Sequence, residues 1–330
     1  MKNGRVAVII PTYNEERYIA DCLQSVFVQD YGSANLDIMV VDGGSLDDTR
    51  RIVREIAARE PNVRLIENPR KIQASAFNIG VAASDAPFIV RLDAHAVYAP
   101  DYISLCVKHL EENGRYGNVG GRWDIRARRS SLIADANAVL NRMRFGIGGA
   151  DFRVGGRAGE VDTVPFGAFR RETVEKIGGM NESLPRGEDN EYNARIRAAG
   201  YAVYFDPRIV STYYARPTVG ASLRQMYANG VSIGILWMKY RAAVGLRHLV
   251  PLLFVCSLVV GGISALFVPF FRYLLLAEIV VYAVADLFSC AVASRRAGWR
   301  NMLVLPWLIP MVHISYGIGT FVGIVKSNNR

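Results

Sequence analysis

The sequence predicts an α/β domain with a mostly parallel, twisted sheet and helices on both faces, followed by a C-terminal membrane domain. Apolar runs rich in β-branched residues alternate with segments of helical period, which is typical of repeated strand–helix units. Polar residues follow the ends of these runs, where ligands bind in sheets of this kind. Long segments with little or no charge occur only near the C-terminus, and they predict membrane-spanning helices.

Four mostly apolar runs are expected to form strands, and the first of them is continuously apolar, as is typical of a strand buried on both faces. They lie at residues 6–10, 36–41, 63–66 and 88–92. Asn14 is expected to cap the first helix, with Glu15 and Glu16 in its first turn. We expect the remaining elements of the domain to be a strand near 119–125 and helices at 47–58, 100–112, 171–178 and 190–199.

Asp93 and His95 are two residues apart directly after the fourth run, so an extended backbone points both side chains to one side. Such a pair can hold one divalent cation, which would bridge the diphosphate of a donor and neutralise the charge of the leaving group. The alternative is an aspartate that caps a turn beside an incidental histidine. The sequence contains neither GxGxxG after the first run nor GxxxxGK[ST], so a dinucleotide or P-loop site is not expected.

A second group of acids, Glu188 and Asp189, adjoins a predicted helix. A carboxylate here could deprotonate an acceptor hydroxyl and so free its oxygen to attack an anomeric carbon. The alternative is that these acids only favour the positive end of the helix dipole. Downstream, Arg216, Arg224 and Gln225 offer donors suited to phosphate oxygens, unless they belong to a solvated face near the membrane.

Three segments at the C-terminus are long and apolar enough to cross a bilayer as helices. They lie at residues 249–268, 273–293 and 302–325. Pro306 and Pro310 would bend the third segment or leave part of it in the interface, so two spans with an interfacial helix remain an alternative. A buried helical hairpin is not expected, because three long apolar segments in succession exceed the needs of a soluble core.

Cationic residues predict the orientation of these segments. The turn after the first segment carries only Arg272, whereas the opposite ends are flanked by Arg241, Arg247, Arg295, Arg296 and Arg300. We therefore expect a cytosolic domain at residues 1–230, a juxtamembrane segment at 231–248 and a membrane domain at 249–330. The expected location is the plasma or inner membrane.

Charge and cysteine content argue against several classes of protein. The net charge of +9 suits contact with anionic headgroups or phosphorylated substrates, but the dispersed arginines do not form the basic stripe of a nucleic-acid binder. The four cysteines are far apart and form no CxxC pair, so neither a disulfide framework nor a zinc site is expected. The apolar run at 6–10 is too short for a secretory signal.

Four motifs, in their order and spacing, resemble those of glycosyltransferase family 2 of the GT-A fold. They are Pro11-Thr12-Tyr13-Asn14-Glu15, Val41-Asp42-Gly43-Gly44-Ser45, Asp93-Ala94-His95 and Gly187-Glu188-Asp189. The resemblance spans residues 5–230 and is greatest to the succinoglycan-biosynthesis type of glucosyltransferase, which shares the DAH variant and a hydrophobic C-terminus. It implies an inverting enzyme with a GT-A fold that uses a nucleotide-sugar donor and a divalent cation.

The resemblance also implies roles for individual residues. The nucleotide-sugar site would comprise Pro11, Thr12, Tyr13, Glu15, Asp42, Asn78 and Asp93, with Asp42 on the base or ribose. Asp93 and His95 would bind Mn²⁺ or Mg²⁺, and the choice stays open because His95 replaces the second carboxylate of the family's DxD. Asp189 would be the catalytic base. The diphosphate or the acceptor would contact Glu188, Arg216, Arg224 and Gln225.

These roles predict transfer of one sugar, with a UDP-sugar favoured as donor, to a polyprenyl-diphosphate-linked saccharide in exopolysaccharide or other surface-glycan biosynthesis. The expected partners are the donor, the lipid-linked acceptor, membrane lipid and other polysaccharide-assembly proteins, but no nucleic acid. Residues 224–229 resemble the QxxRW element of processive synthases but lack its Arg and Trp at the expected places, so chain elongation is not favoured. Two alternatives remain: transfer to a polyprenyl phosphate, and a membrane-tethered nucleotide-binding protein without activity.

Overall fold

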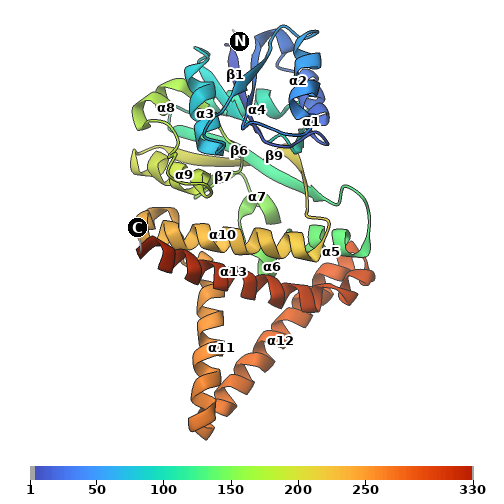
Figure 1. Ribbon diagram of the computed structural model, residues 1–330, viewed down its shortest axis with the longest axis vertical. Coiled ribbons are helices and arrows are strands. Elements are labelled where there is room, and N and C mark those ends of the chain that lie inside the picture. Colours follow the sequence, from blue (N-terminus) through green and yellow to red (C-terminus); the bar gives the residue numbers. More distant parts are fainter. Residues whose placement is uncertain (1–3, 329–330) are drawn as a thin grey trace. The chain divides into compact units, whose positions relative to one another are not determined.

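The computed structural model describes residues 4–328, which form two compact units (Figure 1). Among these residues, unit 1 comprises 4–124 and 155–213, and unit 2 comprises 125–154 and 214–328. The expected boundary at residue 230 falls inside helix α10 (Val219–Lys239). Unit 2 therefore combines an insertion from the middle of the chain with the C-terminal part.

Unit 1 is built on a mixed sheet. Within residues 4–328 nine strands form it, in the order β3-β2-β1-β4-β8-β6-β9-β5, with β7 paired to β9. Strands β1 to β4 pair with one another in parallel, as predicted. The later strands add antiparallel pairs. The bounds are β1 (Val6–Thr12), β2 (Leu36–Asp42), β3 (Val63–Glu67), β4 (Phe88–Arg91), β5 (Ala96–Tyr98), β6 (Tyr116–Arg126), β7 (Gly159–Val161), β8 (Ala168–Arg170) and β9 (Ala202–Tyr214).

Helices cover both faces of this sheet, as the alternating pattern predicts. Side chains on one face of β1, such as Val8, share a core with helices α1 (Ile19–Phe27), α2 (Thr49–Ala57) and α4 (Tyr102–Glu112). Ile9 faces the other way and touches Gly80 of α3 (Gln73–Ala82), where a Cβ atom would lie 2.7 Å from the Ile9 side chain. The remaining helices of the unit are α8 (Arg171–Ile177) and α9 (Glu188–Ala198).

The first helix begins at Ile19, so the expected cap at Asn14 is wrong. Asn14 has a positive φ of 55°, a conformation that asparagine tolerates better than most residues. Its backbone N–H donates to Ser45 Oγ at 2.8 Å, and its Oδ1 accepts the N–H of Leu46 at 2.8 Å. Asn14 thus ties the loop after β1 to the loop after β2 instead of starting a helix.

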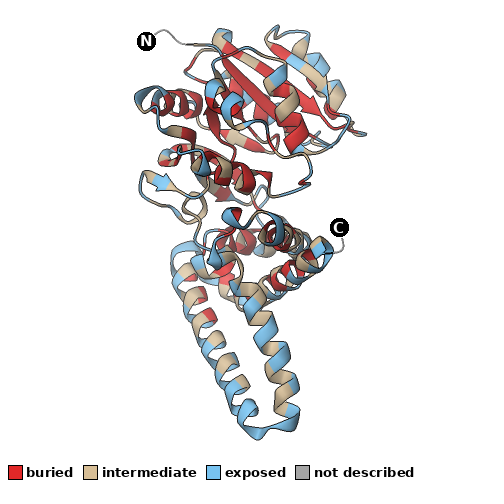
Figure 2. Ribbon diagram, turned by 90° about the vertical axis from the view of Figure 1, so that its left-hand side faces the viewer, coloured by how far each residue is buried: buried red, intermediate tan, exposed pale blue. Residues whose placement is uncertain are grey.

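Unit 2 is helical, and three of its helices are long and apolar enough to cross a membrane. Among the described residues these are α11 (Val250–Phe267), α12 (Pro269–Ala297) and α13 (Leu305–Asn328), which confirms the three predicted apolar segments as helices. Helices α11 and α12 form a hairpin whose surface is mostly exposed or half-buried (Figure 2). The other helices of the unit are α5 (Leu132–Leu140), α6 (Arg144–Ile147), α7 (Asp151–Val154) and α10.

Unit 2 has a hydrophobic core of its own. It joins α5, α10, the end of α12 and the first half of α13, and its buried members include Leu140, Met226, Cys290, Leu308 and Val312. Pro310 lies inside α13, yet the helix is continuous from Leu305 to Asn328. Pro306 and Pro310, which were expected to bend this segment, therefore do not interrupt the helix.

Helices α10 and α13 lie side by side in contact through glycines (Figure 1). A Cβ atom at Gly234 would lie 2.2 Å from the Thr320 carbonyl oxygen, and one at Gly319 would lie 2.2 Å from the Tyr227 carbonyl oxygen. Both distances are far below van der Waals contact, so the two backbones approach as closely as they do only because these residues have no side chain.

Replacing Gly234 by Ala should separate the two helices. We expect the thermal midpoint of the detergent-solubilised protein to fall, by the equivalent of about 1–3 kcal/mol, because overpacking displaces backbone rather than a flexible side chain. Gly262→Ala in α11 is the matched control, since a Cβ there meets nothing within 4 Å and alanine favours a helix over glycine. Equal midpoints for the two variants would contradict the close packing of α10 and α13.

Candidate active site

A cleft opens at the carboxyl edge of β1 and β4, where the predicted ligand-binding residues meet. Its lining includes the predicted Pro11, Thr12, Tyr13, Glu15, Asp93 and His95, together with Gly43, Asn68, Lys71, Ile72, Gln73 and Ala94. A larger groove of about 640 Å³ lies at the opposite edge, beside the start of β2. It contains the surface ion pairs of Arg5 and Arg64, whereas the predicted site residues line the first cleft, which is therefore the candidate active site.

Hydrogen bonds connect the two loops that border this cleft. Besides the contacts of Asn14, the N–H of Glu15 donates to Thr49 Oγ1 at 2.8 Å, and the N–H of Glu16 donates to Asp47 Oδ2 at 3.1 Å. The register of the sheet explains why the loops meet, because Thr12 at the end of β1 lies opposite Asp42 at the end of β2. The cleft is thus held by main-chain donors that do not depend on a ligand.

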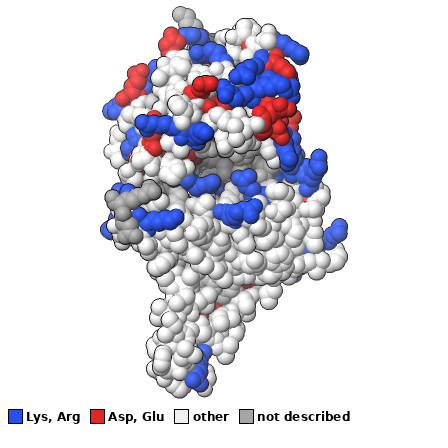
Figure 3. Space-filling model, viewed as in Figure 1, with Lys and Arg blue, Asp and Glu red and all other residues white. Residues whose placement is uncertain are grey.

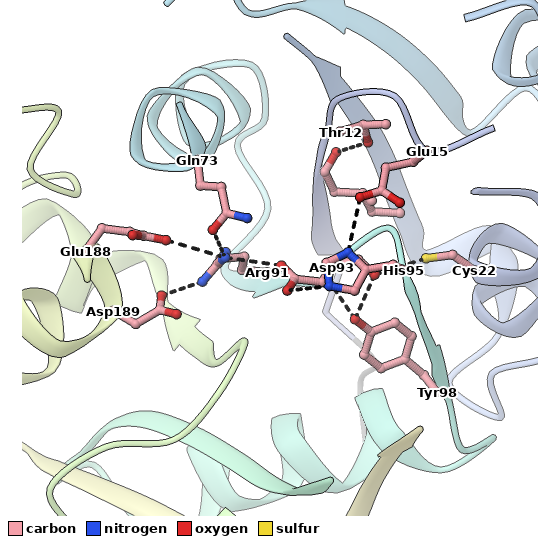
Figure 4. A network of polar contacts seen from close by, with 11 residues as sticks. Thr12, Glu15, Cys22, Gln73, Arg91, Asp93, His95, Tyr98, Glu188 and Asp189 are labelled. Carbon is pink, nitrogen blue, oxygen red and sulfur yellow. Dashed lines mark hydrogen bonds and ion pairs between the residues drawn. The ribbon is translucent and has the colours of Figure 1, made fainter. Parts of the chain in front are cut away.

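His95 is oriented by Glu15 and faces Asp93. Its Nδ1 lies 3.2 Å from Glu15 Oε1, which leaves Nε2 directed to Asp93 Oδ2 at 3.9 Å (Figure 4). Hydrogen bonding of one ring nitrogen to a carboxylate is the usual support for a histidine that binds metal through the other. The pair therefore fits a divalent cation whose remaining ligands come from a substrate and water, although residues 4–328 offer no cluster of three protein ligands.

Arg91 at the end of β4 holds the acidic residues of the site together (Figure 4). It is 1% exposed, and its Nη2 lies 3.1 Å from Asp93 Oδ1 and 3.7 Å from Glu188 Oε1. Its Nη1 is ion-paired with Asp189, and Gln73 Oε1 accepts a further hydrogen bond from Nη2 at 2.7 Å. Burial alone would lower the pKa of the guanidinium, but the three carboxylates outweigh it and raise this pKa, so Arg91 is always cationic.

Glu188 and Asp189 form the first turn of α9 rather than preceding it, and they differ in access to solvent. The side chain of Glu188 is 6% exposed, whereas that of Asp189 is 36% exposed. Burial and the neighbouring Asp189 carboxylate together raise the pKa of Glu188 to about 7, against the opposing effect of Arg91. Burial also raises the pKa of Asp189 against the opposing effect of Arg91. Asp189 is thus the carboxylate that an incoming molecule can reach.

Two predicted nucleotide-sugar residues are engaged within the protein. Asp42 has a side chain 1% exposed, and its carboxylate accepts hydrogen bonds from the N–H groups of Gly44 and Ser45, both at 3.0 Å. Asn78 Oδ1 accepts the N–H of Met180 at 2.8 Å, while its Nδ2 donates to the Met180 carbonyl at 2.9 Å. Contact of either residue with a donor would need these bonds to be exchanged, so their binding roles stay predictions.

Arg216, Arg224 and Gln225 belong to unit 2, unlike the other predicted residues. Arg216 follows β9, and the other two lie in the second turn of α10, where the side chain of Arg224 is exposed. Their part in binding a diphosphate or an acceptor remains a prediction.

Sequence reasoning missed Arg91 and Lys71. A charged residue inside the apolar run at 88–92 was the available signal for Arg91, because a buried cation requires anionic partners. Lys71 lines the cleft with a positive φ of 59° and lies against Gly43 and Gly44. Nothing in its local sequence indicates that conformation, which depends on the packing of two loops.

Comparisons with known proteins identify the family of this chain. Residues 7–178, just over half of the chain, match the family described as "Glycosyl transferase family 2". Two curated relatives are a dolichyl N-acetyl-α-D-glucosaminyl phosphate 3-β-D-2,3-diacetamido-2,3-dideoxy-β-D-glucuronosyltransferase of Methanococcus voltae and the succinoglycan biosynthesis protein ExoA of Rhizobium meliloti. The first is 25% identical over 98% of each chain, and the second is 28% identical over 74% of each.

A solved structure shares the fold. The mannosyltransferase PcManGT of Pyrobaculum calidifontis, in complex with GDP-Man and Mn²⁺, aligns over 98% of this chain and 87% of its own, with a TM-score of 0.59 and 22% identity. TarS 1–349 of S. aureus in complex with UDP aligns over 98% of this chain and 91% of its own, with a TM-score of 0.50 and 16% identity. The sheet, the strand-end residues and the matched family together show that the chain belongs to glycosyl transferase family 2 and has the GT-A fold.

Proposed function

We propose that this glycosyltransferase is an inverting, metal-dependent enzyme that moves a sugar from a nucleotide-sugar donor to a lipid-linked saccharide. The reaction would take place at the cytosolic face of the plasma or inner membrane, in the biosynthesis of exopolysaccharide or another surface glycan. The observation that carries this proposal is the ion-pair cluster of Arg91, which joins Asp93, at the metal end of the cleft, to Asp189. Leaving-group and acceptor chemistry need groups of these two kinds close together.

The donor would occupy the cleft between the loops after β1 and β2. Thr12, Tyr13 and Glu15 line it, and the Lys71 side chain offers a cation for the diphosphate. Related structures were solved with GDP-Man and with UDP, so the fold accepts more than one base. We favour a UDP-sugar on the family resemblance.

Asp93 and His95 would hold the divalent cation, Mn²⁺ or Mg²⁺. When bound, it would supply positive charge to the diphosphate as that group leaves. Glu15 fixes the imidazole of His95, and Arg91 fixes the carboxylate of Asp93, so both side chains are oriented before a ligand arrives. The Mn²⁺ in the mannosyltransferase complex supports a cation in this fold.

Asp189 would act as the base for an acceptor hydroxyl. It would take the hydroxyl proton as the acceptor oxygen bonds to the anomeric carbon, while the bond from that carbon to the diphosphate oxygen breaks and its electron pair stays on the diphosphate. Direct displacement of this kind inverts the anomeric centre. The Methanococcus voltae relative, whose name gives a dolichyl phosphate sugar as acceptor, supports a lipid-linked saccharide here.

The metal pair can be tested through nucleotide binding. Asp93→Ala should abolish the effect of Mn²⁺ on nucleoside-diphosphate binding, because it removes the only carboxylate of the pair. His95→Asp restores two carboxylates, should keep activity and should favour Mg²⁺ more strongly than the parent does. Thermal-shift titrations with and without each metal would measure both effects. Full loss of activity in His95→Asp would show that His95 has another role.

The base can be tested by an isosteric substitution. Asp189→Asn keeps the shape and removes the basicity, so turnover should fall by roughly a hundredfold to ten-thousandfold, while nucleotide affinity barely changes. Glu188→Gln should be milder, because its side chain is almost inaccessible. If Glu188→Gln eliminated turnover and Asp189→Asn did not, the base would be Glu188. If neither mattered, transfer to a phosphate oxygen, which needs no base, would replace the proposed reaction.

Arg91→Lys tests whether one side chain serves both ends of the site. A lysine keeps the charge but cannot contact Asp93, Asp189 and Gln73 in a fork, so metal-dependent nucleotide binding and turnover should fall together, the latter at least about tenfold. Arg64→Lys, which alters a surface ion pair with Asp37, is the matched control and should leave both within twofold. An Arg91→Lys enzyme as active as this control would contradict the coupling role.

A further inference from the structure

Helix α13 is long and apolar enough to cross a membrane, but it is bound along its length to a helix that is not. Among the described residues, α10 is not one of the helices apolar enough to cross a membrane, and it carries Arg224, Gln225 and Asn229. Ser315 Oγ donates to the Leu223 carbonyl at 2.9 Å, and Gly323 packs against the Val231 carbonyl, so the helices run parallel in constant register. A bilayer-spanning α13 would carry these polar residues of α10 into the hydrocarbon.

Segments around the first half of α13 are also unlike a membrane interior. His313 Nε2 lies 2.8 Å from the Gly146 carbonyl oxygen, and Ser222 Oγ of α10 donates to Asn137 Oδ1 of α5 at 2.7 Å. Both partners belong to the insertion 125–154, which carries six arginines and two aspartates. The core of unit 2 thus binds α13 to segments rich in charge.

Exposure distinguishes α13 from the hairpin. In the most apolar 18-residue stretch of each helix, 0% of the residues of α11 and 11% of those of α12 are buried, so lipid can surround both helices. In the corresponding stretch of α13, 39% of the residues are buried. The exposed apolar residues of α13 recur every three or four positions and form one stripe, which is the pattern of a helix lying at an interface; they are Trp307, Met311, Ile314, Ile318, Phe321 and Val325.

The hairpin leaves α13 from its middle rather than running beside it. A Cβ atom at Gly317 would lie 2.4 Å from the Pro251 carbonyl oxygen and 2.6 Å from Val255, so the first turns of α11 meet the centre of α13. The rest of α11 extends away, and α10 and α13 lie across the base of the hairpin (Figure 1). This arrangement suits a membrane anchor of two helices, α11 and α12, with α10 and α13 lying along the membrane surface.

We propose that only α11 and α12 cross the bilayer, while α13 lies in the headgroup region with its exposed stripe toward the acyl chains and α10 on its far side. The C-terminal end of α13, at Asn328, would then lie on the side of the membrane that holds unit 1. This inference does not depend on the proposed reaction.

The charge of unit 2 supports its location at a surface of anionic lipid. The sequence of unit 2, at 125–154 and 214–330, holds 17 Lys and Arg against 4 Asp and Glu, a net charge of +13, whereas unit 1 holds 22 against 26 and is negative. In this arrangement Arg272, in the turn of the hairpin, would be the one cationic residue on the side of the bilayer opposite unit 1, and Lys326 would lie on the same side as unit 1. On the face shown in Figure 3, the surface of the hairpin carries few charged side chains.

Cysteine labelling of the full chain tests the topology. In a Cys256→Ser background, single variants Leu46→Cys, Val268→Cys and Asn328→Cys would be exposed to a membrane-impermeant maleimide in intact cells and in inverted vesicles. Leu46→Cys and Asn328→Cys should label in the same preparation, and Val268→Cys in the other. Asn328→Cys labelling together with Val268→Cys would overturn the proposal in favour of three spans. Val268→Cys labelling together with Leu46→Cys would overturn the spanning hairpin.

Depth measurements test whether α13 lies flat. Spin labels at positions 307, 314 and 321, all on the exposed stripe, should report depths that agree within a few ångströms, measured by collision with oxygen and with a water-soluble nickel complex. A spanning helix would separate the outer two labels by about 21 Å along the bilayer normal. Labels at Leu253 and Val260 of α11 are the control and should differ in depth. A progressive change of depth from 307 to 321 would exclude the flat helix.

Discussion

A guanidinium enclosed in protein must be surrounded by anions, and the candidate active site of unit 1 depends on that requirement. Removing an ion from water costs several kcal/mol unless partners compensate, and Arg91 is 1% exposed. Of its partners, Asp93 is two residues away in the sequence and Asp189 is 98 residues away. Each partner is itself a carboxylate that needs a cation. The charges therefore stabilise one another, and one buried cation fixes the positions of both Asp93, of the proposed metal pair, and Asp189, the proposed base.

The antiparallel half of the sheet brings those partners together. Strand β8 pairs with β4 so that Val90 lies opposite Ala168, and the chain then passes through α8 to the start of α9. A sheet continued only by parallel strands would need a crossover after β4 and would place the next strand end elsewhere. The change in strand direction is thus the topological reason that the first turn of α9 faces the carboxyl edge of β4.

Local pattern was enough to predict the strands β1 to β4, the strand-end Asp93 and His95, and three apolar helices. Those features depend on apolar runs, period and length, which a single sequence displays. Asn14 was assigned to a helix because its cap signal is local, whereas its positive φ depends on Ser45 and Leu46 across the loop. The partners of Arg91 and the glycine contacts of α10 are tertiary, so neither periodicity nor composition could indicate them. Family resemblance supplied the residue roles that pattern did not.

The two loops that border the cleft are braced against each other before any donor arrives. Main-chain groups of Asn14, Glu15 and Glu16 are already satisfied by side chains of the neighbouring loop. Ordering a flexible loop would subtract from the free energy of association, and here that entropy was lost during folding. A nucleotide bound in this cleft, as proposed above, would therefore meet a rigid surface, and we expect its binding to resemble lock-and-key docking more than induced fit.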